Sequence, residues 1–314
     1  MKVLFVCSGN KNNGIGHVVK NQGDSLTKAG INVEYFTISR KGFWGYIKGA
    51  FNLSRHLRKN SYDIIHAHYS LSAFSSAMAF PKQPIVVSLM GSDSQMNMFW
   101  KTIIHICSAF FWREVIVKSS EMKEKTKLNE AHVIPNGVDL QKFRIIDKPE
   151  AQSNIGFGPA LKNIVFIANP ERKEKNYELA ESAVLMLNEE RVKLHTVFDQ
   201  PQPKVLNYLC AADLLILTSL WEGSPNIIKE AMACNCPIVS TDVGDVKWLF
   251  DQEPGHFITS NKTEDVASKI RDCLKFIKGS ARTKGRMRMI KMGLDDETIA
   301  SRIITVYKKA LKTS

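Results

Sequence analysis

Short apolar runs rich in β-branched residues alternate along the chain with amphipathic stretches of helix length, and this alternation constrains the fold more than any other feature. It is typical of parallel sheets whose crossover connections are helices. The pattern occurs twice. The first series predicts strands near Val3–Cys7, Val33–Phe36, Ile64–Ala67, Ile85–Leu89 and Val115–Val117. The second predicts strands near Asn163–Ala168, Leu194–Val197, Leu214–Leu217 and Ile238–Ser240.

The two series indicate two α/β domains, each a doubly wound parallel sheet, in a chain of 314 residues. Between them lies a segment rich in Gly, Pro and Asn, so we place the boundary between 1–147 and 148–294. Residues 295–314 have helical apolar spacing, with acids first and lysines last. We expect this terminal helix to pack back on the first domain.

Targeting and cysteine patterns favour a cytoplasmic location. The first apolar segment meets Gly9 too soon for a signal peptide, and the longest apolar run, Met98–Trp112, contains Lys101 and His105. We therefore expect neither a signal peptide nor a transmembrane helix. The six cysteines are scattered without Cys-x-x-Cys or Cys/His metal spacing, which favours reduced thiols.

The positive charge is uneven, because residues 1–150 contribute +9 of the formal net charge of +12. Part of it lies in a basic, aromatic stretch: Lys41, Trp44, Tyr46, Lys48, Phe51, Arg55, Arg58 and Lys59. This bias favours an anionic partner, such as an anionic membrane, a phosphorylated acceptor or nucleic acid. Nucleic acid is least favoured, because the charges are not interleaved as in known recognition modules. An ordinary solvated helix fits the stretch equally well.

The most informative stretch, Thr218–Ala233, follows a predicted strand. Gly223 allows a close turn, and Pro225 suits a first helical position, so a helix should begin here with free N–H groups for phosphate. Asn226 and Glu230 are four residues apart and share a helix face. Two glutamates alone, Glu222 and Glu230, would indicate little.

With its surroundings, the stretch resembles the signature of the retaining glycosyltransferases of family 4, also called group 1, which have the GT-B fold of two Rossmann-like domains facing a cleft. Family-like features recur in order along the chain: the glycine-rich loop at 12–17, the segments 63–68 and 91–93, and Ile134–Asp139. The resemblance implies a similar fold and a nucleotide-sugar donor. It also implies that the loop at 240–245 supports the donor loop, and that the segment 199–204 adjoins the nucleobase.

The resemblance implies specific roles for residues of the second domain. Glu222 would contact hydroxyls of the donor sugar, and Glu230 would bind the ribose hydroxyls. Gly223, Ser224, Pro225, Asn226 and Ile227 would form the donor loop. Arg172 and Lys175, which follow the first strand of this domain, would stabilise the departing diphosphate, so that neither a metal nor a cofactor is expected.

The first domain contains a second group of candidates. Gly14 and Gly16 open a predicted helix, where backbone N–H groups could approach phosphate or acceptor. His17, His68 and Asp93 are acceptor-side candidates. We expect at most one of His66 and His68 to reach the site, on the view that they face opposite sides of the sheet. Met90 stands where many family members have a histidine that touches the sugar, so that role lacks its usual residue.

The resemblance predicts transfer of a hexose from a UDP-sugar to a glycan or lipid-linked acceptor, with retention, in synthesis of a cell-surface polysaccharide of capsule or teichuronic acid type. The enzyme would work in the cytoplasm, at the inner face of the plasma membrane. Two alternatives use a related scaffold: a sugar-nucleotide epimerase and a phosphorylase. A basic nucleic-acid-binding protein is the alternative from another class.

Overall fold

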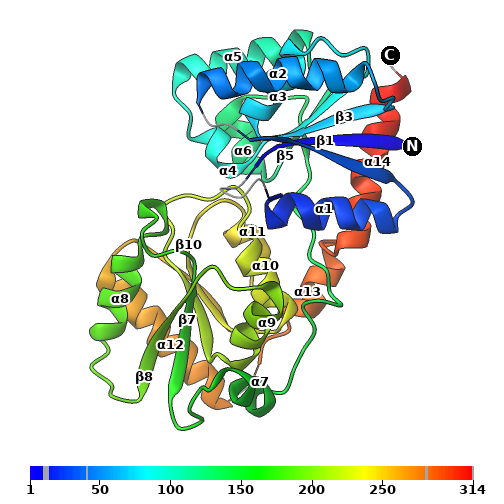
Figure 1. Ribbon diagram of the computed structural model, residues 1–314. Coiled ribbons are helices and arrows are strands. Elements are labelled where there is room, and N and C mark those ends of the chain that lie inside the picture. The colour runs from blue at the N-terminus through cyan, green and yellow to red at the C-terminus, as the bar shows by residue number, and fades with distance from the viewer. Residues whose placement is uncertain (10–13, 40–41, 280–281, 313–314) are drawn as a thin grey trace. The chain divides into compact units, whose positions relative to one another are not determined.

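The computed structural model describes residues 1–9, 14–39, 42–279 and 282–312. The chain divides into two compact units, Met1–Gly137 with Asp296–Ser314, and Val138–Asp295 (Figure 1). In the described part of the chain, no helix is both long and apolar enough to cross a membrane.

The first unit contains a six-stranded parallel sheet in the order β2-β1-β3-β4-β5-β6. Its central strands are buried on both faces, as in the run Val3–Val6, because helices cover both sides. The elements in chain order are β1 (Lys2–Ser8), α1 (His17–Lys28), β2 (Asn32–Ile38), α2 (Phe43–Leu57), β3 (Ile64–His68), α3 (Ser70–Met78), β4 (Ile85–Ser88), α4 (Gly91–Ser94), α5 (Met98–Phe110), β5 (Glu114–Val117), α6 (Ser120–Thr126), β6 (His132–Val133) and α14 (Asp296–Lys312).

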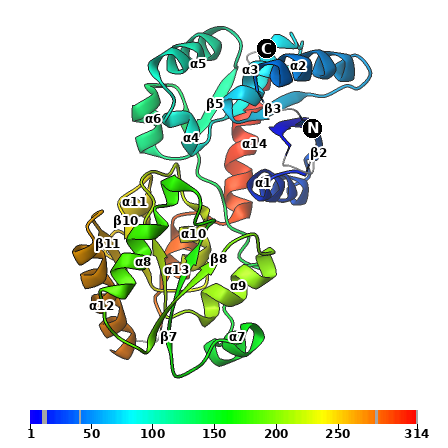
Figure 2. The same ribbon diagram turned by 60° about the vertical axis from the view of Figure 1, so that its left-hand side comes forward.

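Helices α2, α3 and α5 cover one face of this sheet, and α1 and α14 cover the other (Figures 1 and 2). The last helix, α14, is held on the sheet by a buried hydrogen bond of 2.6 Å between Tyr307 Oη and His66 Nδ1. Lys309 Nζ also lies 3.0 Å from Glu114 Oε2 on β5. The inward face of α14 buries Ile299, Ile303, Val306 and Tyr307.

The second unit contains a five-stranded parallel sheet in the order β11-β10-β9-β7-β8. Helices α8 and α12 cover one face, and α9, α10 and α13 cover the other (Figures 1 and 2). Its elements are α7 (Lys148–Ile155), β7 (Lys162–Ile167), the 3₁₀ turn η1 (Lys173–Lys175), α8 (Tyr177–Leu185), β8 (Val192–Val197), α9 (Gln202–Ala211), β9 (Leu214–Leu217), α10 (Asn226–Ala233), β10 (Ile238–Thr241), α11 (Val246–Phe250), β11 (His256–Thr259), α12 (Thr263–Gly279) and α13 (Gly285–Lys291).

The units meet in sequence at Gly137 and Val138, earlier than the 147/148 boundary suggested by composition. The intervening segment is tied to the second unit by its backbone. Arg286 on α13 donates hydrogen bonds to the carbonyls of Leu140 at 2.8 Å and Phe143 at 2.7 Å. Phe143 is also buried. Linker-like composition therefore coincides here with an ordered part of the second unit.

In each sheet, the order of the strands reverses at one position, between β1 and β3 in the first unit and between β7 and β9 in the second. Loops that leave neighbouring strands in opposite directions at such a point open a crevice at the carboxyl edge of the sheet, where α/β proteins bind their ligands. The candidate residues of the second unit follow β7 and β9, which places them at this crevice.

Candidate functional site

The loop between β9 and α10 carries the donor-loop candidates. Strand β9 is wholly buried, and Thr218 and Ser219 continue the buried chain before it turns at Trp221 and Glu222. Pro225 is the N-cap of α10 rather than its first residue, and the helix begins at Asn226. Helix α10 packs on the sheet through Ile228, Ala231 and Met232, which are fully buried, whereas Ile227 is half-buried.

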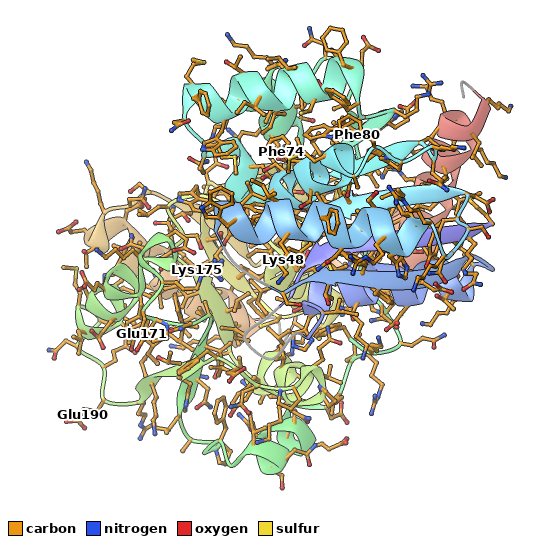
Figure 3. The ribbon with its side chains drawn as sticks, turned by 45° about the horizontal axis from the view of Figure 1, so that its top comes forward. Lys48, Phe74, Phe80, Glu171, Lys175 and Glu190 are labelled. Atoms are coloured by element: carbon orange, nitrogen blue, oxygen red, sulfur yellow. The ribbon has the colours of Figure 1, made fainter. Side chains whose placement is uncertain are left out.

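The structure brings two of the predicted catalytic residues together. Lys175 Nζ lies 2.5 Å from Glu222 Oε1, and both side chains are largely buried, with 14% and 15% exposed. Ser219 Oγ donates a second hydrogen bond of 2.8 Å to the same oxygen. Figure 3 shows Lys175 on the segment that also carries Glu171. A carboxylate held by a cation and a hydroxyl is fixed in position and in charge.

Backbone contacts join the Lys175 segment to the loop after β9. Thr218 Oγ1 donates to the carbonyls of Lys175 and Asn176, at 3.2 and 2.9 Å. The amide of Leu220 donates to the Glu174 carbonyl at 2.9 Å. The two loops on either side of the crevice are therefore one connected structure.

Arg172 contacts a different acid from the one in the Lys175–Glu222 pair. Its guanidinium forms an ion pair with Glu174, with Nε 2.7 Å from Oε1, and its side chain is 55% exposed. Sequence reasoning joined Arg172 and Lys175 as two phosphate-binding cations, but the structure pairs each with a different acid. Arg172 can exchange Glu174 for another anion at little cost, because an exposed ion pair contributes little to stability.

Glu230 lies on α10 and is half-buried. Burial raises the pKa of its carboxyl to about 7, against the opposing effect of the Lys229 ammonium. Carboxyl groups whose pKa is raised towards neutral pH by burial are common in ligand sites. The structure thus gives Glu230 a property that the Glu222–Glu230 spacing does not reveal.

A buried polar network under the donor loop was missed by sequence reasoning. Lys229 is fully buried, and its Nζ donates to Ser224 Oγ at 3.0 Å. Ser224 Oγ donates in turn to Asp245 Oδ2 at 2.6 Å. Burial lowers the pKa of Lys229 to about 8, while the charges of Asp245 and Glu230 act to raise it. This network fixes Ser224 by its side chain.

The loop after β10 supports the donor loop from below, as the resemblance implied. Gly244 has φ +61°, and a Cβ built there would lie 2.8 Å from the carbonyl oxygen of Gly223 and 3.2 Å from that of Glu222. Only glycine fits both this backbone conformation and this close approach. Thr241 Oγ1 also donates to the Ser219 carbonyl at 2.7 Å.

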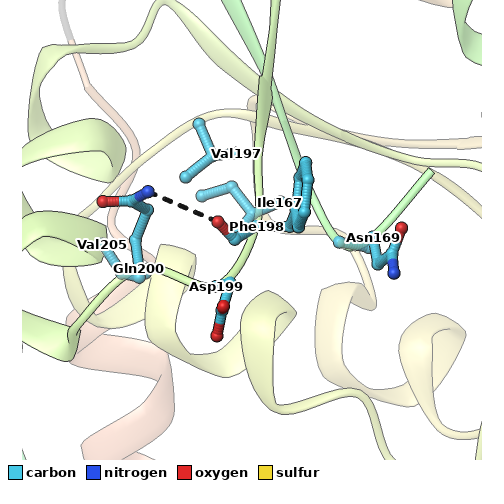
Figure 4. A pocket seen from close by; sticks show the side chains of 8 residues that line it. Ile167, Asn169, Val197, Phe198, Asp199, Gln200 and Val205 are labelled. Atoms are coloured by element: carbon cyan, nitrogen blue, oxygen red, sulfur yellow. Dashed lines mark hydrogen bonds between the residues drawn. The ribbon is translucent and has the colours of Figure 1, made fainter.

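A cavity of about 400 Å³ opens at the carboxyl ends of β7 and β8, beside the donor-loop crevice (Figure 4). It is lined by Ile167, Ala168, Asn169, Val197, Phe198, Asp199, Gln200 and Val205. The Phe198 side chain is 48% exposed, which leaves its ring available to a planar ligand. The sequence signal for this cavity is an aromatic residue directly after a strand, which is too common to identify a site by itself.

In the first unit, Gly14 and Gly16 precede α1, and Asn12 and Asn13 lie outside the described residues. A Cβ at either glycine would meet no protein atom within 4 Å, so the space above this backbone is open. His17, the first residue of α1, is exposed. Gly14, Gly16 and His17 are therefore accessible near the carboxyl end of β1. Contacts among the described residues do not hold them together as one group.

The expectation that His66 and His68 face opposite sides of the sheet is wrong. Their rings stack with centroids 4.3 Å apart, because residues two apart in a strand share a face. His68 is 2% exposed, and neither of its ring nitrogens has a hydrogen-bond partner among the described residues. Burial and the Lys118 charge hold the pKa of both histidines well below the usual value, so both are neutral.

Asp93 is fully buried, and its carboxylate accepts hydrogen bonds from neighbouring backbone amides. Its Oδ2 accepts a hydrogen bond from the Met90 amide at 2.6 Å, and its Oδ1 accepts one from the Ser70 amide at 3.3 Å. Burial raises the pKa of its carboxyl to about 6. The geometry therefore gives Asp93 the role of joining the starts of α3 and α4. Its acceptor role stays a prediction.

Within the described ranges, no three His, Cys, Asp or Glu side chains gather as a metal-binding group. The cations nearest Glu222 and Glu230 are Lys175 and Lys229. The chemistry that these residues can perform is the binding of hydroxyl groups by carboxylates and the stabilisation of anionic oxygens by an ammonium.

Two family models match this chain, one in each half. The model described as Glycosyltransferase Family 4 matches residues 12–142, and the model described as Glycosyl transferases group 1 matches residues 163–275. Together these ranges include every candidate residue named above. The first match lies in the first unit but for its last residues, and the second lies within the second unit.

Named relatives agree with these matches. The putative teichuronic acid biosynthesis glycosyltransferase TuaC of Bacillus subtilis is 27% identical over 66% of this chain and 60% of that protein. The Escherichia coli UDP-Gal:α-D-GlcNAc-diphosphoundecaprenol α-1,3-galactosyltransferase is 24% identical over 68% of this chain and 66% of that protein. This chain thus matches less than two thirds of the length of either relative.

Solved structures share the fold at low sequence identity. Sucrose-phosphate synthase from Thermosynechococcus elongatus superposes with a TM-score of 0.82 at 16% identity, covering 100% of both chains. HepE from Anabaena, in complex with UDP and glucose, superposes with a TM-score of 0.77 at 18% identity, covering 98% of this chain and 99% of that one.

Proposed function

Because this chain belongs to the group 1 and family 4 glycosyltransferases and has their GT-B fold, we propose that it transfers a hexose from a UDP-sugar to a glycan or lipid-linked acceptor in cell-surface polysaccharide biosynthesis. The observation that carries the proposal is the Lys175–Glu222 pair, fixed at the carboxyl edge of the second sheet. The names of the B. subtilis and E. coli relatives support the polysaccharide and lipid-linked alternatives for the acceptor.

In this proposal, the second unit holds the donor. The nucleobase enters the cavity beside Phe198, where the ring can stack on it, and Glu230 accepts hydrogen bonds from the ribose hydroxyls. The N–H groups at the start of α10 face the diphosphate. Glu222 accepts hydrogen bonds from hydroxyls of the sugar, and Lys175 turns from Glu222 to the phosphate oxygens.

Catalysis then depends on charge and position. The leaving nucleoside diphosphate gains negative charge, which Lys175 and Arg172 stabilise, and we propose that no metal or cofactor is needed. With retention, the acceptor hydroxyl attacks on the face that the diphosphate leaves, and a phosphate oxygen takes its proton. Glu222 and Glu230 position the substrate and form no covalent bond to it.

The surface charge and the state of the cysteines support the proposed cellular location. All six cysteines are free thiols, five of them buried, which suits a reducing compartment. The basic first domain suits an anionic partner. We propose a cytoplasmic enzyme that works at the inner face of the plasma membrane, with Gly14 and Gly16 among the donor-binding residues and His17 on the acceptor side.

The test is a thermal-shift screen against UDP-, GDP-, ADP- and CMP-sugars with the Glu230→Ala and Glu190→Ala variants. Glu190 is exposed and lies away from Lys175 in the second unit (Figure 3). At about 100 times Kd, a UDP-sugar should raise the Tm of the wild type and of Glu190→Ala by about 5 °C, and that of Glu230→Ala much less. Equal shifts in the three proteins would contradict the assigned site.

A second measurement distinguishes glycosyl transfer from epimerisation of the donor sugar. Release of UDP from the donor should depend on an added acceptor, and the anomeric configuration of the product, read by NMR, should match that of the donor. Conversion of the donor sugar without an acceptor would instead favour an epimerase.

A further inference from the structure

Large apolar side chains are exposed together on one face of the first unit, which we call the α2–α5 face. They come from α2, from the end of α3 and from α5: Trp44, Phe51, Phe80, Met98, Phe99 and Phe110. Trp44, Phe110 and Phe80 are each about four-fifths exposed. Single exposed apolar residues are ordinary, but a group of this size on neighbouring elements indicates a surface that something covers.

Beneath this face lies an apolar cavity of about 600 Å³ between α2, α3 and α5. Its walls are side chains such as Tyr46, Leu71, Phe74, Trp100 and Ile103. Phe74 stacks between Trp100 and Trp112, with ring centroids 5.8 and 5.6 Å away, so one wall is rigid. Figure 3 shows Phe74 and Phe80 between α2 and α5. The cavity can therefore take an apolar chain without repacking the core.

A second cavity of about 890 Å³ adjoins the first and differs in its chemistry. The two share Ile47, Met78 and Phe80 as walls, but the second is also lined by Arg58 and Lys82. Both cations are exposed, and neither has an ion-pair partner among the described residues. These two neighbouring cavities, together called the hollow, thus offer carbon at one end and positive charge at the other.

Charge decides between the possible occupants. A second copy of this chain would bring the same cations together across a two-fold axis, which is unfavourable. An anionic amphiphile matches both ends of the hollow. The exposed Trp44, Met98 and Phe110 lie outside the cavity lining, so a single bound molecule would leave them in water. A bilayer would cover them as well.

Phe80 has an unusual backbone. It follows α3 in the left-handed region, with φ +47°, where glycine is the usual residue after a helix. A bulky aromatic residue there is strained, and its side chain is exposed, so packing within the described residues does not account for it.

We propose that the two cavities form one site for an anionic membrane phospholipid, with an acyl chain in the apolar cavity and the phosphate against Arg58 and Lys82. The α2–α5 face then docks on the bilayer around this lipid. The proposal makes specific the membrane setting proposed above and is independent of glycosyl transfer, because binding needs no donor.

The first experiment is co-sedimentation with vesicles, without nucleotide sugar. The protein should bind phosphatidylglycerol vesicles and bind phosphatidylcholine vesicles weakly. Arg58→Glu and Lys82→Glu should each lower the affinity at least about tenfold, whereas Lys59→Glu, the same charge change at a neighbouring residue outside both cavities, should lower it about threefold. Equal losses in Arg58→Glu and Lys59→Glu would mean diffuse attraction and would overturn the site.

Phe80→Gly separates docking from folding. Glycine suits the left-handed backbone, so Tm should stay the same or rise, while vesicle affinity should fall about tenfold. A variant that folds normally and binds vesicles as the wild type does would overturn the role of the cavity. Donor binding, read by the thermal shift, should be unchanged in every variant, so failure here leaves the proposed function standing.

Cys107 reports directly on the acyl chain. It lines the apolar cavity and is half-buried, whereas the other five cysteines are buried. Phosphatidylglycerol vesicles should therefore slow its alkylation by N-ethylmaleimide at least about fivefold. Binding without such protection would overturn chain entry. Protection that grows with protein concentration in the absence of vesicles would instead assign the face to a second copy of the chain.

Discussion

At the scale of single residues, the chemistry of the proposed donor site depends on two residues that are adjacent in sequence and differ in burial. Lys229 is fully buried and reaches Ser224, while Glu230 is half-buried. Each charge moderates the other, since Lys229 lowers the pKa of Glu230 and Glu230 raises that of Lys229, but burial is the larger effect on both. The result is a carboxyl that changes its charge within the physiological range.

This predicts a pH-dependent donor affinity. With the pKa of Glu230 raised to about 7, the carboxylate that accepts ribose hydroxyl hydrogen bonds is mostly protonated at pH 6 and mostly ionised at pH 8. The Kd for UDP-glucose, measured by calorimetry, should therefore fall about tenfold between these pH values. The diphosphate of a nucleotide sugar is diesterified and does not titrate there, so the slope reports on the protein.

Glu230→Gln is the control, and its Kd should be weaker and independent of pH. The stability of the ligand-free protein should change in the opposite sense. A raised carboxyl pKa stabilises the fold below the ordinary value of 4.5, and this stabilisation is lost as pH rises through about 7. The same slope in Glu230→Gln as in the wild type would show that another group titrates.

Sequence could place Glu222, Glu230 and Lys175 after the strands of the second sheet, because each follows a predicted apolar run. Their roles come from the family resemblance and stay predictions. Sequence could not identify Lys229 as buried, because a lysine on a helix is ordinarily exposed and its partner Asp245 comes from another loop. Phe198 was missed for a similar reason. It is recognisable only from the cavity that it lines, which is formed at the ends of two strands about 30 residues apart in sequence.

At the scale of elements, the loop after β10 determines where the donor loop can lie. Gly244→Ala should destabilise the second unit by about 2 kcal/mol or more, because a Cβ would both strain φ at +61° and lie 2.8 Å from the Gly223 carbonyl. Donor affinity should fall as well, since Glu222 and Gly223 must move. Urea unfolding and the UDP-sugar thermal shift measure the two effects.

Gly156→Ala is the matched control for this variant. Gly156 also has a positive φ, +71°, but a Cβ there would meet nothing within 4 Å. It should cost about 1 kcal/mol from backbone strain and leave donor affinity unchanged. If both alanine variants bound the donor equally well, the support of the donor loop by Gly244 would be refuted.

The pattern of elements was largely predictable because each buried strand is a short apolar run. The exceptions show the limits of that signal. Sequence did not single out β6, which has two half-buried residues, or β11, which is mostly half-buried, because edge strands lack a continuous apolar run. The segment before α7 has a linker composition, yet Arg286 orders it through backbone carbonyls, which no side-chain pattern records.

At the scale of the whole molecule, the second unit is inserted in sequence between the main part of the first unit and its last helix. Each unit has its own apolar core. Such units fold with separate stabilities unless their contacts are extensive. Helix α14 contributes Tyr307, fully buried, to the first unit, although it follows the second unit in the chain.

A chain that ends at Asp295 should therefore lose the structure of the first unit and keep that of the second. In scanning calorimetry, the truncated protein should show a transition whose Tm a UDP-sugar still raises, because Arg172, Lys175 and the proposed donor residues from Glu222 to Glu230 lie within Val138–Asp295. Tyr307→Phe is the milder variant. It removes the hydroxyl that bonds His66 Nδ1 and should cost the first unit about 1–2 kcal/mol. Loss of the donor response on removal of α14 would mean that the second unit cannot fold or bind alone, and the assignment of the donor site to it would fail.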